Sequence, residues 1–199
     1  MIILWIGVPL LSFLLQFLPD LEGLPITSLV ALIVSSVGGT LSAIMLSTSI
    51  VSERNRHVYD LFLVRSVRRS SLILSKYFAV YLCLVVTVLI SLSVGLIIDS
   101  ITGDITIDYL DATFESLGIG ISLMSITCSI GIFFGVLVPS VVAAAILSVY
   151  AGSNLSSLIM IPTFFIEALN PLRYAVVAGI IVTCVIQTIN IIIFNHRQF

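Results

Sequence analysis

The longest uncharged stretch of this sequence limits its fold more than any other feature. Residues 116–166 run for 51 positions, between Glu115 and Glu167, without Asp, Glu, Lys or Arg. A single helix of that length would measure about 76 Å, more than twice the hydrocarbon core of a bilayer at roughly 30 Å. The stretch must therefore fold back within a membrane. Pro139 is the predicted hinge, because proline interrupts the helical hydrogen-bond ladder.

The other apolar segments extend this interpretation to the whole chain. Charged residues make up 9% of the 199 residues, whereas soluble domains carry about 25%. A transmembrane helix needs about 20 predominantly apolar residues. We therefore predict one all-α, polytopic membrane domain whose six spans are residues 1–18, 27–51, 77–98, 116–137, 141–161 and 174–194.

The first of these spans begins at the initiator methionine, without a basic segment or a small-residue cleavage site. It is therefore interpreted as a retained span and not as a signal peptide. Two interpretations of its start stay open: the native chain begins at Met1, or it begins upstream with a further cytoplasmic segment.

The basic residues set the predicted orientation. Six of the eight Lys and Arg residues lie between Arg54 and Lys76, in the segment that joins the second and third spans. Because short loops rich in Lys and Arg stay in the cytoplasm, residues 52–76 are predicted to form a cytoplasmic elbow. Both termini then lie inside, and the outer loop 99–115 carries acidic residues.

The elbow has the pattern of an amphipathic helix. Val58, Leu61 and Phe62 are spaced i, i+3 and i+4, which places them on one face, while Arg56 and Asp60 share the opposite side. On this pattern alone, two interpretations stay open. The helix either lies on anionic lipid at the inner membrane surface or binds a soluble partner.

Two motifs favour the soluble partner. The first combines Glu53-Arg54, Asp60-Leu61-Phe62, an arginine at Arg68 or Arg69, and Lys76 at the start of the third span. The second is Asn170-Pro171-Leu172-Arg173-Tyr174, just before the last span. In a six-span chain, these motifs resemble the permease subunits of type-2 ATP-binding-cassette exporters. That family has Glu-Arg-Glu, Leu-Leu, Arg and Gly-Lys in the first segment and Asn-Pro-Leu-x-Tyr in the second.

The resemblance implies that the chain works with a separate motor. No glycine-rich phosphate loop followed by Lys and Ser or Thr is present, so a partner ATPase would bind ATP and Mg²⁺. This chain is expected to hold no catalytic, cofactor or metal site. The other implied partners are a second permease chain, as homodimer or heterodimer, and membrane lipid, without nucleic acid. The residues expected to couple to the ATPase are Glu53, Arg54, Arg56, Asp60, Leu61, Phe62, Arg65, Arg68, Arg69 and Lys76.

Within the spans, polar and small residues give further expectations. Gln187 and Asn190 share a face of the last span at i, i+3, where they either line a substrate path or form interhelical hydrogen bonds. The pair Gly131-x-x-x-Gly135 predicts close helix packing. The three cysteines, each alone in an apolar run, are predicted to be buried small hydrophobes and not redox or metal centres.

The predicted function is therefore export of a substrate across the plasma membrane, driven by a partner ATPase. One alternative is a stand-alone transporter or channel whose basic elbow binds lipid. Another is a membrane scaffold that transports nothing. The scarcity of charge inside the spans argues against an ion-coupled carrier and fits an apolar or amphipathic cargo.

Overall fold

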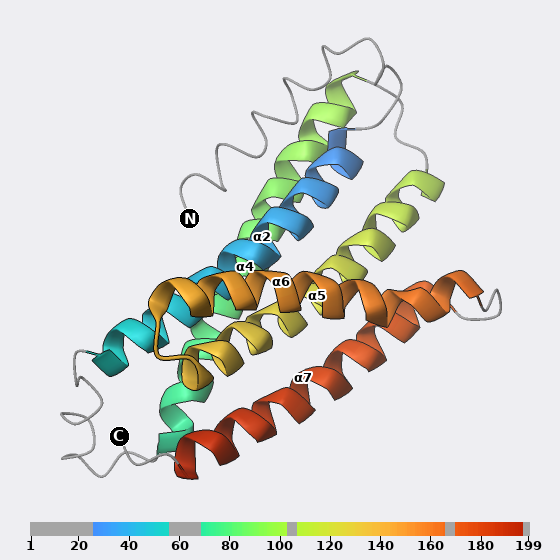
Figure 1. Ribbon diagram of the computed structural model, residues 1–199. Coiled ribbons are helices and arrows are strands. Elements are labelled where there is room, and N and C mark those ends of the chain that lie inside the picture. The colour runs from blue at the N-terminus through green and yellow to red at the C-terminus, as the bar shows by residue number, and fades with distance from the viewer. Residues whose placement is uncertain (1–25, 56–68, 103–106, 166–169, 197–199) are drawn as a thin grey trace.

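The computed structural model describes residues 26–55, 69–102, 107–165 and 170–196, and within these ranges the chain forms five helices (Figure 1). The described part of the chain is all-α, as predicted. The helices are α2 (Ile26–Asn55), α4 (Arg69–Thr102), α5 (Ile107–Leu137), α6 (Val141–Phe165) and α7 (Pro171–His196).

Four of the described helices are long and apolar enough to cross a bilayer. Large apolar side chains are exposed along them, including Leu82 at 59%, Val142 at 67% and Ile180 at 59%. Such extensive apolar exposure suits contact with lipid. The chain is a helical membrane protein, and the candidate spans within the described ranges are Ser71–Val94, Thr113–Leu137, Val141–Thr163 and Pro171–Phe194.

The count of six spans stays a prediction. The second predicted span, residues 27–51, lies within α2, but α2 is not among the four candidate spans. The first predicted span, residues 1–18, lies outside the described residues.

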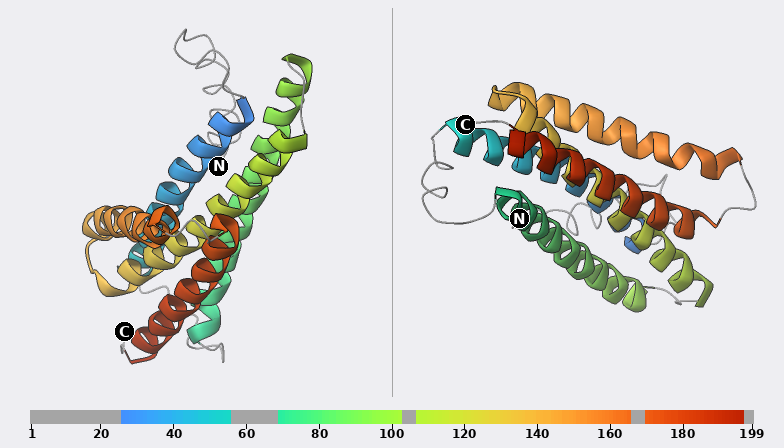
Figure 2. Two further views of the ribbon diagram at one scale, coloured as in Figure 1. Left: turned by 90° about the vertical axis from the view of Figure 1, so that its right-hand side faces the viewer. Right: turned by 90° about the horizontal axis from the view of Figure 1, so that it is seen from below.

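Helix α5 forms the centre of the bundle and contacts each of the other four described helices. Of the most apolar window of this helix, a share of 72% is buried, compared with 33% or less for the corresponding windows of the other candidate spans. Figures 1 and 2 show α2, α4 and α5 running from one end of the bundle to the other, with α6 crossing obliquely on the outside. The arrangement leaves α5 as the helix on which the others pack.

Glycine allows the closest of these contacts, between α5 and α2. A Cβ atom added to Gly131 would lie 2.8 Å from the Cα of Ala43, and one added to Gly135 would lie 3.1 Å from the Cα of Ser47. Only residues without a side chain permit such a close backbone approach. The packing predicted for Gly131-x-x-x-Gly135 is therefore confirmed.

The predicted hinge at Pro139 is also confirmed. Helix α5 ends at Leu137 and α6 begins at Val141. The Val138 N–H donates to the carbonyl of Phe134 over 2.9 Å, which extends the α5 hydrogen-bond pattern by one residue. The uncharged stretch thus folds back where proline stops the helix.

The predicted outer loop 99–115 is wrong in its extent. Helix α4 continues to Thr102 and α5 already begins at Ile107, so most of the acidic segment is helical. The apolar pattern marks only the part of a helix that suits hydrocarbon. A helix satisfies its own backbone and can continue beyond that region.

The prediction for the cysteines was wrong at two positions. Cys128 is buried, but Cys83 and Cys184 are exposed on α4 and α7. A lipid-facing residue and a protein-facing residue have the same apolar surroundings in the sequence, so hydropathy does not separate them.

Candidate functional site

Charged side chains from both ends of the predicted elbow meet where α2 and α4 converge. The Lys76 ammonium forms an ion pair with the Glu53 carboxylate, which also accepts a 3.0 Å hydrogen bond from the Ser49 hydroxyl. The side chains of Lys76 and Glu53 are 21% and 31% exposed. Partial burial screens such a pair less than a fully exposed one. The ion pair joins the last turns of α2 to the first turns of α4.

Arg54 extends this cluster to α5. Its Nη1 donates to the carbonyl of Val136 over 3.0 Å, and its Nη2 donates to the carbonyl of Val138 over 3.2 Å. The last carbonyls of a helix have no partners within the helix, and a cation there also interacts favourably with the helix dipole. Arg54 therefore caps α5 immediately before the Pro139 hinge.

Apolar packing fixes the same end of the bundle. Ile50 of α2, Ile73 of α4, Val136 of α5 and Phe194 of α7 are buried in one hydrophobic cluster. We call the set of Glu53, Arg54 and Lys76 the elbow anchor. The elbow anchor and this hydrophobic cluster together hold one end each of α2, α4, α5 and α7 in fixed positions.

The structure thus brings three of the ten predicted coupling residues together. Arg69 is the first residue of α4. The other six lie outside the described residues: Arg56, Asp60, Leu61, Phe62, Arg65 and Arg68. A contact of any of the ten with an ATPase stays a prediction.

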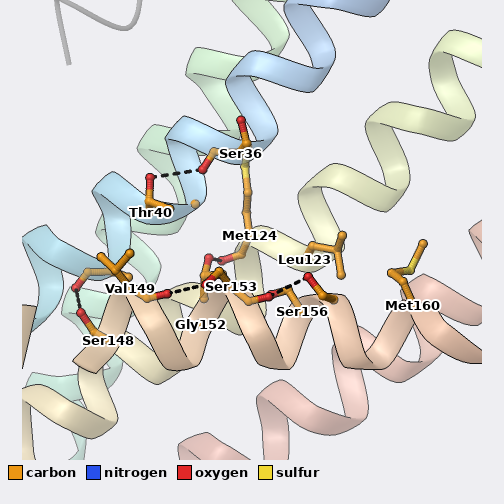
Figure 3. Close-up of a pocket in the computed structure, with 14 residues that line it drawn as sticks. Ser36, Thr40, Leu123, Met124, Ser148, Val149, Gly152, Ser153, Ser156 and Met160 are labelled. Atoms are coloured by element: carbon orange, nitrogen blue, oxygen red, sulfur yellow. Dashed lines mark hydrogen bonds between the residues drawn. The ribbon is translucent and has the colours of Figure 1, made fainter. Parts of the chain in front are cut away.

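A groove with a volume of about 520 Å³ lies between α2, α5 and α6 (Figure 3). Among the residues that the structure describes, no formally charged side chain lines it. Most of its hydroxyls donate to carbonyls of their own helices, as Thr40 does to Val37 and Thr127 does to Met124. A hydroxyl that donates in this way can also accept a hydrogen bond. The hydroxyl residues of the groove include Ser36, Thr40, Thr127, Ser148, Ser153 and Ser156.

Two buried serines of α6 behave differently in this groove. The hydroxyl of Ser148 donates to the carbonyl of Ala145 over 2.8 Å and lies 3.2 Å from the hydroxyl of Ser47 on α2. The Ser156 hydroxyl is buried and has no hydrogen-bond partner within the described part of the chain. A buried hydroxyl without a partner is unfavourable, so Ser156 differs in energy from the hydrogen-bonded Ser148.

These serines give opposite stability predictions. Ser148→Ala should lower the free energy of unfolding by about 1 kcal/mol, because a formed hydrogen bond is lost. Ser156→Ala should leave it unchanged or raise it, because an unsatisfied group is removed. We would measure thermal unfolding as labelling of buried Cys128 by a thiol-reactive dye, with Cys83→Ala and Cys184→Ala as the background. Equal losses in both variants would show that the Ser156 hydroxyl has a partner.

Gln187 and Asn190 lie elsewhere, at the contact between α7 and α5. The Gln187 Nε2 donates to the Ser129 hydroxyl over 3.4 Å, and the Asn190 Nδ2 donates to the Ser129 carbonyl over 3.2 Å. Both amides are buried, and neither lines the hydroxyl groove. The predicted interhelical hydrogen bonds are confirmed, whereas a contact with substrate stays a prediction.

The groove itself was missed in the sequence. Ser148, Gly152 and Ser156 recur at i, i+4 and i+8 and so share one face of α6. Ser148 and Gly152 indicate close packing, as small residues do in any multispan protein. Small residues on one helix do not by themselves distinguish a groove from a close helix contact. Hydroxyl residues on the facing helix, here Ser36 and Thr40 of α2, make that distinction.

The fold and these sites define a multi-pass α-helical membrane protein with a hydroxyl-lined groove and a charged anchor at one end. Comparison with known proteins gives no relative: no family model, no curated protein and no solved structure matches the chain.

Proposed function

We propose that the chain is the permease subunit of a type-2 ATP-binding-cassette exporter in the plasma membrane of the cell. A separate ATPase subunit would bind ATP and Mg²⁺ and drive the export of a substrate. The resemblance of the elbow and of residues 170–174, at the start of α7, to that family supports this proposal. The structural observation that carries it is the elbow anchor.

The anchor suits the transmission of a force. The Glu53–Lys76 ion pair joins α2 to α4, and Arg54 joins α2 to α5. A displacement of the segment between Asn55 and Arg69 would therefore move three helices together, as rigid elements do in switching proteins. Two of these helices, α2 and α5, are also walls of the groove. A push from an ATPase on the elbow would thus reach the groove.

The groove suggests the class of cargo. Its volume of about 520 Å³ falls within the range typical of small-molecule sites. Hydroxyl groups without a formal charge favour an uncharged, amphipathic molecule, since a charged one would lack a counter-ion there. We propose such a molecule as the substrate, in agreement with the scarcity of charge in the spans.

The elbow provides the test of the exporter. Replacing Asp60, Leu61 and Phe62 together with alanine should abolish co-purification with a cognate ATP-binding-cassette ATPase. The apolar face that would sit in a groove of the partner is then lost. A matched control is the triple alanine variant of Val177, Ile180 and Ile181. These α7 side chains are similarly apolar and 56%, 59% and 57% exposed, so the control should keep the partner.

Retention of the ATPase by the elbow variant would contradict the proposed coupling of the elbow to the ATPase. If the unaltered chain captures no ATPase and its elbow instead binds vesicles that contain anionic lipid, the alternative of a stand-alone transporter, channel or scaffold is favoured. Insertion of every variant into the membrane is checked first, by its resistance to alkaline extraction.

A further inference from the structure

A second groove, with a volume of about 280 Å³, lies between α5, α6 and α7. Figure 1 shows α6 and α7 close together where α6 ends and α7 begins, and apart at their other ends. Helix α5 packs against both of them and forms the floor of the groove. The described residues that line the groove include Phe133, Phe134, Ala151, Leu155 and Ile189.

The chemistry of this groove differs from that of the hydroxyl groove between α2, α5 and α6. Every described residue that lines it has an apolar side chain. Its walls belong to three candidate spans, Thr113–Leu137, Val141–Thr163 and Pro171–Phe194, so it lies at the depth of the lipid tails. A polar group held there would lose its hydrogen bonds without replacement. The groove therefore suits a hydrocarbon.

The groove is open on one side to whatever surrounds the described helices. Its floor includes Ile130, which is 4% exposed, whereas Ile189 on its rim is 41% exposed. The other lining residues, Phe133 and Leu155 among them, are partly buried. Side chains that border an empty space lose their dispersion contacts on that side. A chain that enters from the surrounding lipid would restore these contacts.

The bulk of the lining favours a flexible chain over a packed helix. Helices approach closely in membranes where small residues face each other, as Gly131 and Gly135 of α5 do against α2. Here Ala151 is the one small residue among the described lining residues. The rings of Phe133 and Phe134 form an edge-to-face pair with centroids 5.3 Å apart. The volume lies just below the range of about 300–1,000 Å³ for small-molecule sites, so the groove holds part of one lipid.

We propose that this groove binds one acyl chain of a membrane phospholipid, which holds α6 apart from α7. The proposal goes beyond the exporter, because it needs only that the three helices span the bilayer. Ala151 and Leu155 line this groove, whereas Gly152 and Ser156, the next residue along α6 in each case, line the hydroxyl groove. Helix α6 thus separates the two grooves. A bound chain limits how far α6 can move toward α7 and so helps to set the width of the hydroxyl groove.

Photolabelling by a lipid tests this site. The chain is reconstituted without an ATPase in phosphatidylcholine vesicles that contain a phosphatidylcholine with a diazirine in one acyl chain, and labelled residues are identified by mass spectrometry. Surrounding lipid should label the exposed side chains of α4, such as Leu82 and Val86. A chain in the groove should also label residues 130–134 of the more buried α5.

Filling the groove should remove the second label. Ala151→Trp places an indole in the groove and should lower the labelling of residues 130–134 at least about tenfold, because fewer methylene groups of the lipid can then be buried. The labelling of α4 should not change. Val142→Trp is the matched control on the same helix, since Val142 is 67% exposed and lines neither groove. This control should keep the label on α5.

Folding of each variant is checked in the background of Cys83→Ala and Cys184→Ala, where buried Cys128 stays protected from a maleimide dye. If Ala151→Trp does not fold, Ile189→Trp at the exposed rim takes its place with the same expected loss. An unaltered chain without label on residues 130–134 would overturn the proposal and show that protein covers the groove. A folded groove variant that keeps this label in full would also overturn it, because the label then comes from surrounding lipid. No ATPase is present, so failure here is separate from failure of the exporter proposal.

Discussion

Replacing Gly131 with alanine should lower the thermal unfolding midpoint of this chain far more than the same change at Gly152. The added methyl group at residue 131 would lie 2.8 Å from both the Cα and the carbonyl oxygen of Ala43. Backbone atoms cannot rotate away as the end of a side chain can, so α2 and α5 must separate. Overpacking of this kind costs about 1–3 kcal/mol, or about 2–4 °C per kcal/mol for a chain of this size.

Gly152→Ala is the matched control for this experiment. Its added methyl group would lie 3.5 Å from the Cγ2 of Thr127, which is an ordinary contact. The midpoint of this variant should stay close to that of the unaltered chain. Labelling of Cys128 reports both midpoints, because this thiol is buried beside Ile132 and Leu46 in the main hydrophobic cluster. Similar midpoints for the two alanine variants would contradict the close packing of α2 on α5.

The second large effect is expected at Arg54. Arg54→Ala would leave the carbonyls of Val136 and Val138 without their guanidinium donors. Hydrogen bonds that involve a charged group contribute about 1.5–3 kcal/mol. We therefore expect a loss of about 2 kcal/mol in the free energy of unfolding, with faster amide hydrogen exchange near Pro139. The free energy of unfolding of Arg54→Lys should lie between those of the unaltered chain and Arg54→Ala, since lysine keeps the charge but cannot reach two carbonyls with a planar fork.

Ser49→Ala serves as the control on the same helix. Its hydroxyl is exposed and donates to Glu53, so its removal should change stability by less than about 0.5 kcal/mol. The comparison separates two roles for Arg54. A residue that serves only to contact an ATPase would leave the stability of the isolated chain unchanged when it is replaced. Unaltered stability of Arg54→Ala would therefore contradict the cap and favour a role in partner contact alone.

The sequence predicts features that depend on one segment at a time. The uncharged stretch and Pro139 are enough to locate the turn between α5 and α6, because both the length limit and the effect of proline act locally. Gly131 and Gly135 predict a close contact for a similar reason. The last predicted span, residues 174–194, also forms a helix, and α7 begins three residues earlier than predicted, with Pro171 in its first position.

Features that depend on partners far apart in the chain could not be predicted. Arg54 donates to a carbonyl 82 residues away, and an arginine in a basic loop gives no sign of such a partner. The groove requires hydroxyl residues of α2 and α6 to come together beside α5, which only the packing decides. The exposed Asn154 and the buried Asn190 are both asparagines in apolar helices, and their surroundings differ only in three dimensions.

The central position of α5 has a consequence for how the chain is made. Helices α2 and α4 leave the ribosome before α5, and α2 carries buried hydroxyls at Ser42 and Ser47 on residues that later lie in the packed bundle. Until α5 is inserted, these groups have no bundle to cover them, and incomplete chains expose surfaces prone to misassembly. A chain cut short before α5 should therefore be a substrate for membrane quality-control proteases, whereas one cut after α7 should escape them.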